Sequence, residues 1–166
     1  MSRAFVKEPD GDAVADNLPE RQMSGHPNYV TPRGLVLLRD EQRRLEHARA
    51  ALADDESLAA KQTRKEIERD LRYFNARVAS AQLVERGLVH TEVGIGSAVE
   101  VMDEQGIVTR YGIAGEDEAD VAQGLVSWVS PLACALLGGR CGEVVTWQRP
   151  DGARELEIVS IVPLSP

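Results

Sequence analysis

Two stretches of helical hydrophobic periodicity occupy the first half of the chain. In the first stretch, leucines recur at the three- and seven-residue spacings of a coiled-coil seam, at Leu35, Leu38, Leu45 and Leu52. After a short polar interval the pattern returns at Ile67, Leu71, Phe74, Val78 and Ala81. Because one helix cannot bury such a seam alone, we predict an antiparallel coiled-coil hairpin over residues 31–86. Its helices should span about residues 32–53 and 56–84.

Three acids, Asp54, Asp55 and Glu56, lie at the turn between the two predicted helices, and we call them the tip acids. Like charges repel at close range, and no basic residue adjoins them in sequence. The tip is therefore either solvated or presented to a cation, and carboxylates are ligands that Mg²⁺ prefers. The alternative is a polar turn that only connects the helices.

From Ser97 the hydrophobic period changes from helical to two. Apolar, β-branched runs predict five strands, at residues 98–102, 107–113, 125–129, 142–148 and 154–162. Ser130-Pro131 begins one short helix, as Thr31-Pro32 begins the first long one, because the hydroxyl caps a helix and proline fits its first turn. We predict an α+β fold, with the hairpin followed by an antiparallel β-sheet domain over residues 87–166.

Composition and charge narrow the picture. Residues 1–30 are polar, without apolar periodicity, and predict a flexible tail. The net charge of −8 is uneven: residues 86–166 carry 5 basic and 12 acidic side chains, whereas residues 31–85 carry 11 and 10. A C-terminal part this acidic is a poor candidate for binding a phosphate backbone, which favours protein partners.

The remaining chemistry is sparse. Cys134 and Cys141 predict neither a disulfide framework nor a metal cluster, and Cys134 is expected to be a small buried residue of the short helix. No apolar run approaches the roughly 18 residues of a membrane span, and no signal peptide is recognisable. We therefore expect a cytoplasmic protein without membrane association.

Several motifs together have a familiar order. They are M-S-R-A-F-V-K-E, L-P-E-R, H-P-N-Y-V-T-P-R-G-L, A-S-A-Q-L-V, G-E-D-E-A-D-V-A-Q-G-L-V-S-W-V-S-P-L-A-C-A-L-L-G-G and E-L-E-I-V-S-I. Over nearly its whole length the chain resembles the GreA/GreB family of bacterial transcript-cleavage and elongation factors. The resemblance implies a coiled-coil hairpin followed by a C-terminal domain with an FKBP-like fold.

The resemblance also implies a partner and a mechanism. The C-terminal domain would dock on bacterial RNA polymerase at the rim of its secondary channel. It would dock through the segment Val129, Ser130, Pro131 and Leu132, which we call the S-P segment. The hairpin would reach down the channel, where the tip acids would help the polymerase's aspartates hold a second Mg²⁺ that activates water against backtracked RNA. The chain would have no catalytic residues or cofactor of its own, and would contact nucleic acid only within the elongation complex. Because both hairpin seams are used internally, we expect a monomer.

Two departures from the family pattern keep alternatives open. The cleaving members carry G-D-x-x-E-N at the tip, where this chain has A-D-D-E-S. The hairpin is also shorter by roughly a dozen residues, or on the order of 10 Å of reach. These departures favour a channel binder that does not cleave, similar to the regulator of nucleoside diphosphate kinase. A peptidyl-prolyl isomerase, suggested by the FKBP-like fold, is disfavoured by an aromatic content of 4%.

Two charged stretches are expected to be structural. The mixed-sign run over residues 61–72 predicts a solvated helix face, with Tyr73 beside the seam rather than stacked on nucleic acid. The D-E-A-D motif, residues 117–120, predicts a solvated loop between strands in preference to part of an acidic rim.

Overall fold

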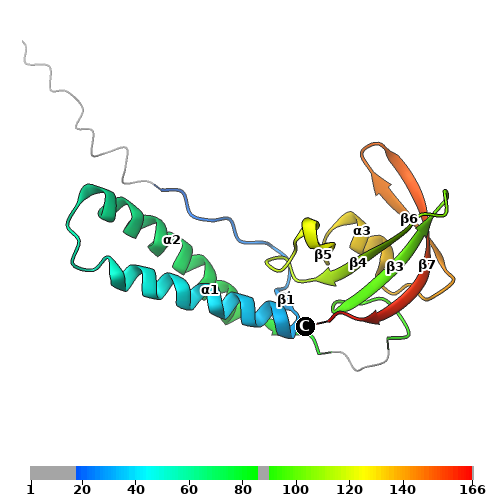
Figure 1. Cartoon of the computed structure of the whole chain (residues 1–166), viewed down its shortest axis with the longest axis horizontal. Helices are drawn as coiled ribbons and strands as arrows, with labels where there is room; N and C mark the ends of the chain where they lie inside the picture. The colour runs from blue at the N-terminus through cyan, green and yellow to red at the C-terminus, as the bar shows by residue number, and fades with distance from the viewer. Residues whose placement is uncertain (1–17, 86–89, 166) are drawn as a thin grey trace, which may run out of the picture.

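The computed structural model describes residues 18–85 and 90–165, and Figure 1 shows two long helices at one end and a curled sheet at the other. This arrangement confirms the predicted α+β class. The elements in chain order are β1 (Tyr29–Val30), α1 (Pro32–Ala51), α2 (Leu58–Ser80), β2 (Gln82–Leu83), β3 (Ser97–Asp103), β4 (Val108–Ala114), the 3-10 helix η1 (Val121–Gln123), β5 (Leu125–Ser127), α3 (Pro131–Leu136), β6 (Val144–Arg149) and β7 (Gly152–Pro163). The tail predicted for residues 1–17 lies outside the described residues.

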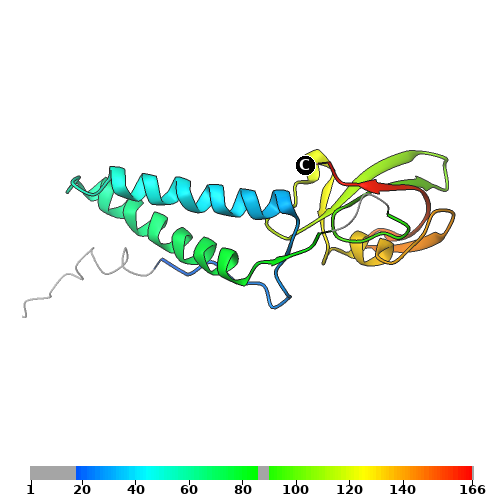
Figure 2. The ribbon, with the colours of Figure 1, turned by 90° about the horizontal axis from the view of Figure 1, so that it is seen from below.

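The helices α1 and α2 run side by side in opposite directions, as Figures 1 and 2 both show. Thr31 caps α1, because its Oγ1 accepts a hydrogen bond from the Gly34 amide at 2.9 Å, and Ser57 caps α2 in the same way. Between the helices, buried side chains of the predicted seams pack together: Leu45, Ile67 and Leu71, with Ala48, Leu52 and Phe74 at their edge. Each fully buried aliphatic side chain contributes about 2 kcal/mol, so this seam holds the hairpin closed.

A small parallel sheet closes the open end of the hairpin. Tyr29 pairs with Gln82 and Val30 with Leu83. The Asn28 side chain is buried, and its Nδ2 donates to the Arg77 carbonyl at 2.7 Å. The tail predicted over residues 1–30 is therefore wrong for residues 28–30, which belong to the hairpin base. Strands of two residues are too short to produce a periodic pattern.

The larger sheet has the strand order β5-β4-β3-β7-β6. The pairs β3/β4, β3/β7 and β6/β7 are antiparallel, whereas β5 runs parallel to β4. The sheet is therefore mixed, and the expectation of a purely antiparallel sheet is wrong at this edge. The reason is the connection over residues 115–124, which includes η1 and returns the chain to the level of Gly112, so that β5 begins beside the last three residues of β4.

The core of the C-terminal part lies between the sheet and α3. Its buried members include Val99, Val101, Ile113, Leu136 and Ile158. Figure 1 shows α3 against one face of the sheet, and no helix of the described residues covers the opposite face of β3, β4, β7 and β6. Within residues 18–85 and 90–165, no helix is long and apolar enough to cross a bilayer.

The expectation that Cys134 is buried is wrong. Both Cys134 and Cys141 are exposed free thiols. The helix α3 turns Leu132, Ala133 and Leu136 toward the core. Helical periodicity therefore leaves Cys134 on the outer side.

Candidate functional site

The tip acids lie at the end of the hairpin farthest from the sheet (Figure 1), and all three are exposed. The Asp55 Oδ1 accepts a hydrogen bond from the Ser57 amide at 2.9 Å, and this bond holds the pKa of Asp55 below its usual value. The Glu56 Oε2 lies 2.9 Å from the Lys61 Nζ, which lowers the pKa of Glu56. The Asp54 side chain forms no hydrogen bond or ion pair with another described residue, so it is the tip acid available to a partner.

The backbone of the tip is held by Arg64, which the sequence pattern placed on a solvated helix face. Its Nη2 donates to the carbonyls of Leu52, Ala53 and Asp55, the last at 3.0 Å. These contacts satisfy carbonyls at the C-terminal end of α1 and place a positive charge there, where the helix dipole favours one. The backbone of the tip is therefore held in one conformation, although the side chains of the tip acids are solvated.

The tip acids have the chemistry of Mg²⁺ ligands but do not form a site by themselves. Within the described residues, no group of three His, Cys, Asp or Glu side chains is arranged to hold a metal ion. Carboxylate oxygens fit the preference of Mg²⁺, and Asp54 offers them without losing another contact. For Asp55 and Glu56 to bind the same metal ion as Asp54, Asp55 would have to release the Ser57 amide and Glu56 would have to release Lys61.

The D-E-A-D motif joins the hairpin to the sheet. The prediction that it forms a solvated loop is therefore wrong for Glu118. Glu118 is only 5% exposed. Its Oε2 accepts a hydrogen bond from the Thr31 hydroxyl at 2.6 Å, and its Oε1 lies 3.0 Å from the Arg33 Nη1. One buried carboxylate therefore contacts the first turn of α1 from the sheet side.

A second ion pair lies beside the first and involves α2. Arg77 is 2% exposed, and its Nε donates to the Asp117 Oδ2 at 2.5 Å, with the Glu116 Oε2 at 3.5 Å from its Nη2. The Tyr73 hydroxyl donates to the other Asp117 oxygen at 2.6 Å, and burial together with this bond raises the pKa of Tyr73 to about 12. We call these side chains the base network: Thr31, Arg33, Tyr73, Arg77, Glu116, Asp117 and Glu118.

The chain before β1, together with β1 itself, lies against both parts of the molecule. The Arg21 guanidinium is 4.0 Å from the Tyr73 ring centroid, and Glu20 pairs with Arg72. Further along, Tyr29 meets the Trp128 ring edge to face at a centroid distance of 5.2 Å. Tyr73 therefore packs within the protein, as the sequence indicated, and is not free to stack on a base.

The S-P segment has a structural role as well as an exposed surface. Ser130 caps α3, with its Oγ accepting from the Ala133 amide at 3.2 Å, and Pro131 is exposed at the first helical position. Val129 is half-buried. Leu132 is 4% exposed and belongs to the core, so its expected role in contacting a partner is not supported by its position. The accessible part of the segment is Val129, Ser130 and Pro131.

Comparisons with known proteins identify the family. Residues 88–163 match the family described as "Transcription elongation factor, GreA/GreB, C-term". Transcription elongation factor GreB of Neisseria meningitidis serogroup B is 33% identical over 151 residues, which cover 81% of this chain and 93% of that protein. Transcription elongation factor GreA of Alkalilimnicola ehrlichii is 40% identical over 106 residues, 62% of this chain and 67% of that protein.

A solved structure is also similar. The crystal structure of the GreA factor homolog Gfh1 of Thermus thermophilus is 29% identical, covers 82% of this chain and 99% of that one, and gives a TM-score of 0.39. The two curated relatives are both named as transcription elongation factors. The chain belongs to the GreA/GreB family.

Proposed function

We propose that this chain binds bacterial RNA polymerase, docks at the rim of the secondary channel, and regulates elongation by presenting its hairpin tip to the catalytic centre. The observation that carries the proposal is the position of the tip acids. They are exposed at the far end of a hairpin in a member of a family of elongation factors. The finer features expected from the resemblance, a coiled coil and an FKBP-like domain, belong to the same proposal.

In this proposal the C-terminal domain is the docking platform. The accessible part of the S-P segment, residues 129–131, contacts the polymerase, while Ser130 also caps α3. The base network then sets the direction of the hairpin relative to that platform, because Glu118 contacts the start of α1 and Asp117 contacts α2 near its end.

The tip acids act as ligands that complete a site belonging to the polymerase. A second Mg²⁺, shared with the polymerase, would stabilise attacking and leaving oxygens in phosphoryl transfer. Asp54 carries this role first, because its carboxylate has no partner within the described residues. Asp55 and Glu56 can bind the metal ion only if they give up their exposed contacts with Ser57 and Lys61, which are worth roughly 0–1 kcal/mol each.

A second candidate function, channel binding without cleavage, is favoured by a specific observation. The turn A-D-D-E-S stands in place of G-D-x-x-E-N, and two of its three acids are engaged by Ser57 and Lys61. A peptidyl-prolyl isomerase is disfavoured. The two tryptophans that could line a proline pocket are used elsewhere, Trp128 against Tyr29 and Trp147 under Arg149.

The test is a time course of RNA cleavage on a backtracked elongation complex with Mg²⁺. It compares the wild type with the triple variant Asp54→Ala, Asp55→Ala, Glu56→Ala, and with Glu46→Ala as a control that removes an exposed acid from the side of the hairpin. Co-elution with polymerase confirms binding in each case. If transcripts are shortened by the wild type and the control but not by the triple variant, cleavage depends on the tip acids. Binding without shortened transcripts establishes the second function, and loss of binding by the wild type refutes both.

A further inference from the structure

The outer face of the larger sheet, which no helix of the described residues covers, presents a row of side chains. Cross-strand pairing places Val108 opposite Met102, Met102 opposite Glu157, and Glu157 opposite Val144. Directly opposed residues share one face of a sheet. Val101, the neighbour of Met102, lies in the core, so this row is on the outer face. Val144 is 60% exposed and Val108 is 53% exposed.

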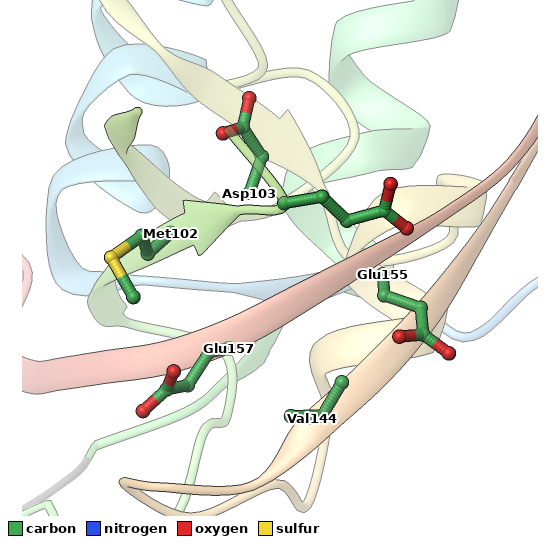
Figure 3. Close-up of a pocket in the computed structure, with 6 residues that line it drawn as sticks. Met102, Asp103, Val144, Glu155 and Glu157 are labelled. Atoms are coloured by element: carbon green, nitrogen blue, oxygen red, sulfur yellow. The ribbon is translucent and has the colours of Figure 1, made fainter. Parts of the chain in front are cut away.

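Carboxylates lie among and beside the apolar side chains of this face, and Glu157 stands between Met102 and Val144 in the row. An open hollow of about 150 Å³ is lined by Met102, Asp103, Glu104, Val144, Glu155 and Glu157 (Figure 3). Asp103 is used locally, because its Oδ1 accepts from the amides of Gln105 and Ile107. The other three acids form no hydrogen bond or ion pair with another described residue. We call Met102, Val108, Val144, Glu104, Glu155 and Glu157 the outer patch.

The two ends of the outer face differ in how they are covered. Toward the hairpin, a Cβ on Gly112 would lie 2.6 Å from the Leu125 Cδ2 and 2.7 Å from the Leu164 Cδ1, so side chains of the protein cover the sheet there. Glu100, in the middle, accepts a hydrogen bond from the Ser160 hydroxyl. At the end of the sheet remote from the hairpin (Figure 1) the hollow is open, and Glu104, Glu155 and Glu157 have no hydrogen bond or ion pair within the described residues.

We propose that the outer patch binds a basic amphipathic helix of a protein partner. Sheet faces are ordinarily covered by helices, and α3 already covers the opposite face. The apolar stripe of such a helix would lie on Met102, Val108 and Val144. Lysine or arginine side chains beside this stripe would extend along the surface to Glu104 and Glu155 and, between Met102 and Val144, to Glu157.

Charge and dimensions define this occupant. The three unpaired carboxylates favour a cationic segment and disfavour nucleic acid, because phosphates would be repelled. Arg154, which lines the adjoining hollow, is paired with Asp151 at 3.8 Å. The row crosses four strands, or roughly 14 Å at about 4.8 Å per strand spacing. An α-helix spans that length in about nine residues, so two to three turns are sufficient.

The experiment uses the full chain labelled with ¹⁵N and a 14-residue peptide of leucine and lysine, with leucines at i, i+3, i+4 and i+7. One control peptide has glutamate in place of lysine, and another has serine in place of leucine. We expect the Leu-Lys peptide to shift the amide signals of Met102, Val144 and Glu157, and both control peptides to leave them unchanged. This test uses no polymerase, so its outcome is independent of the proposed function.

Matched variants separate specific binding from general attraction to an acidic protein. Glu155→Gln with Glu157→Gln should weaken binding of the Leu-Lys peptide about three- to tenfold, as expected for losing two partly exposed charge pairs. Glu46→Gln with Glu85→Gln removes the same charge elsewhere and should have no effect. The proposal is overturned if the Leu-Lys peptide leaves this face unshifted at millimolar concentration, or if both double variants weaken binding equally. Dimerisation of the chain through the patch, seen by sedimentation and lost in Val144→Ser, would also overturn it by assigning the face to a second copy.

Discussion

Arg77 offers the sharpest test of how the hairpin is attached to the sheet. Replacing it with methionine keeps a long side chain in the buried site but leaves Asp117 with the Tyr73 hydroxyl alone, and Glu116 without its cation. Removing one partner of a buried ion pair costs about 3–5 kcal/mol, because the remaining charge is buried without compensation. We expect Arg77→Met to lower the free energy of unfolding by about 3 kcal/mol, toward the low end because Asp117 retains a hydrogen bond.

The measurement is thermal unfolding followed by circular dichroism, and a matched control lies on the same helix. For a chain of this size, about 3 kcal/mol corresponds to a Tm lower by roughly 6–12 °C. Arg72→Met makes the same substitution in an exposed pair with Glu20, where the expected cost is at most about 1 kcal/mol. Equal decreases in Tm for the two variants would refute the reasoning, since burial would then not distinguish the two pairs.

Three further predictions concern other contacts. Because the pKa of Tyr73 is raised to about 12, the neutral phenol stabilises the fold below pH 10 and this contribution is lost as the pH rises from about 10 to 12; unfolding titrations should show the loss in the wild type and a smaller one in Tyr73→Phe. Arg64→Ala should remove the donors that hold the tip carbonyls, costing about 1–2 kcal/mol and speeding hydrogen exchange of the Asp55 amide, whereas unchanged exchange would contradict this role. Asp54→Ala with Asp55→Ala should leave co-elution with RNA polymerase intact and Ser130→Ala with Pro131→Ala should weaken it; equal loss in both would refute the proposed separation of docking from tip activity.

The elements with strong local patterns were predictable, but the second helix ends at Ser80 and not near residue 84, because the chain turns there into β2. The two runs of apolar residues at helical spacing correctly predicted α1 and α2, and the caps Thr31 and Ser130 start α1 and α3 as expected. The parallel direction of β5 was not predictable from its own three residues, because direction depends on the path of the connection before it. The sequence also contains no signal for β1 and β2, which are two residues each.

The base network shows why charged residues are the hardest to interpret from sequence. Glu118 occurs in an acidic run that resembles a solvated loop, and Arg77 stands as a single charge between Ala76 and Val78, yet both are buried. Their partners are remote along the chain, since Thr31 and Glu118 differ by 87 in residue number and Arg77 and Asp117 by 40. A local pattern cannot report such pairs. At the tip, the exposure of the three acids was predictable from the sequence. The role of Arg64 was not, because its contacts with the tip carbonyls exist only in the folded turn.

The attachment of the hairpin at its open end makes it a lever arm. The helix α2 has 23 residues, which gives an arm of roughly 35 Å at 1.5 Å per residue. A rotation of only about 5° at the base network would therefore move Asp54 by about 3 Å, whereas metal coordination distances hold within about 0.2 Å. The angular stiffness of a few buried ion pairs, more than the tip sequence alone, would then decide whether a carboxylate arrives where a metal ion needs it.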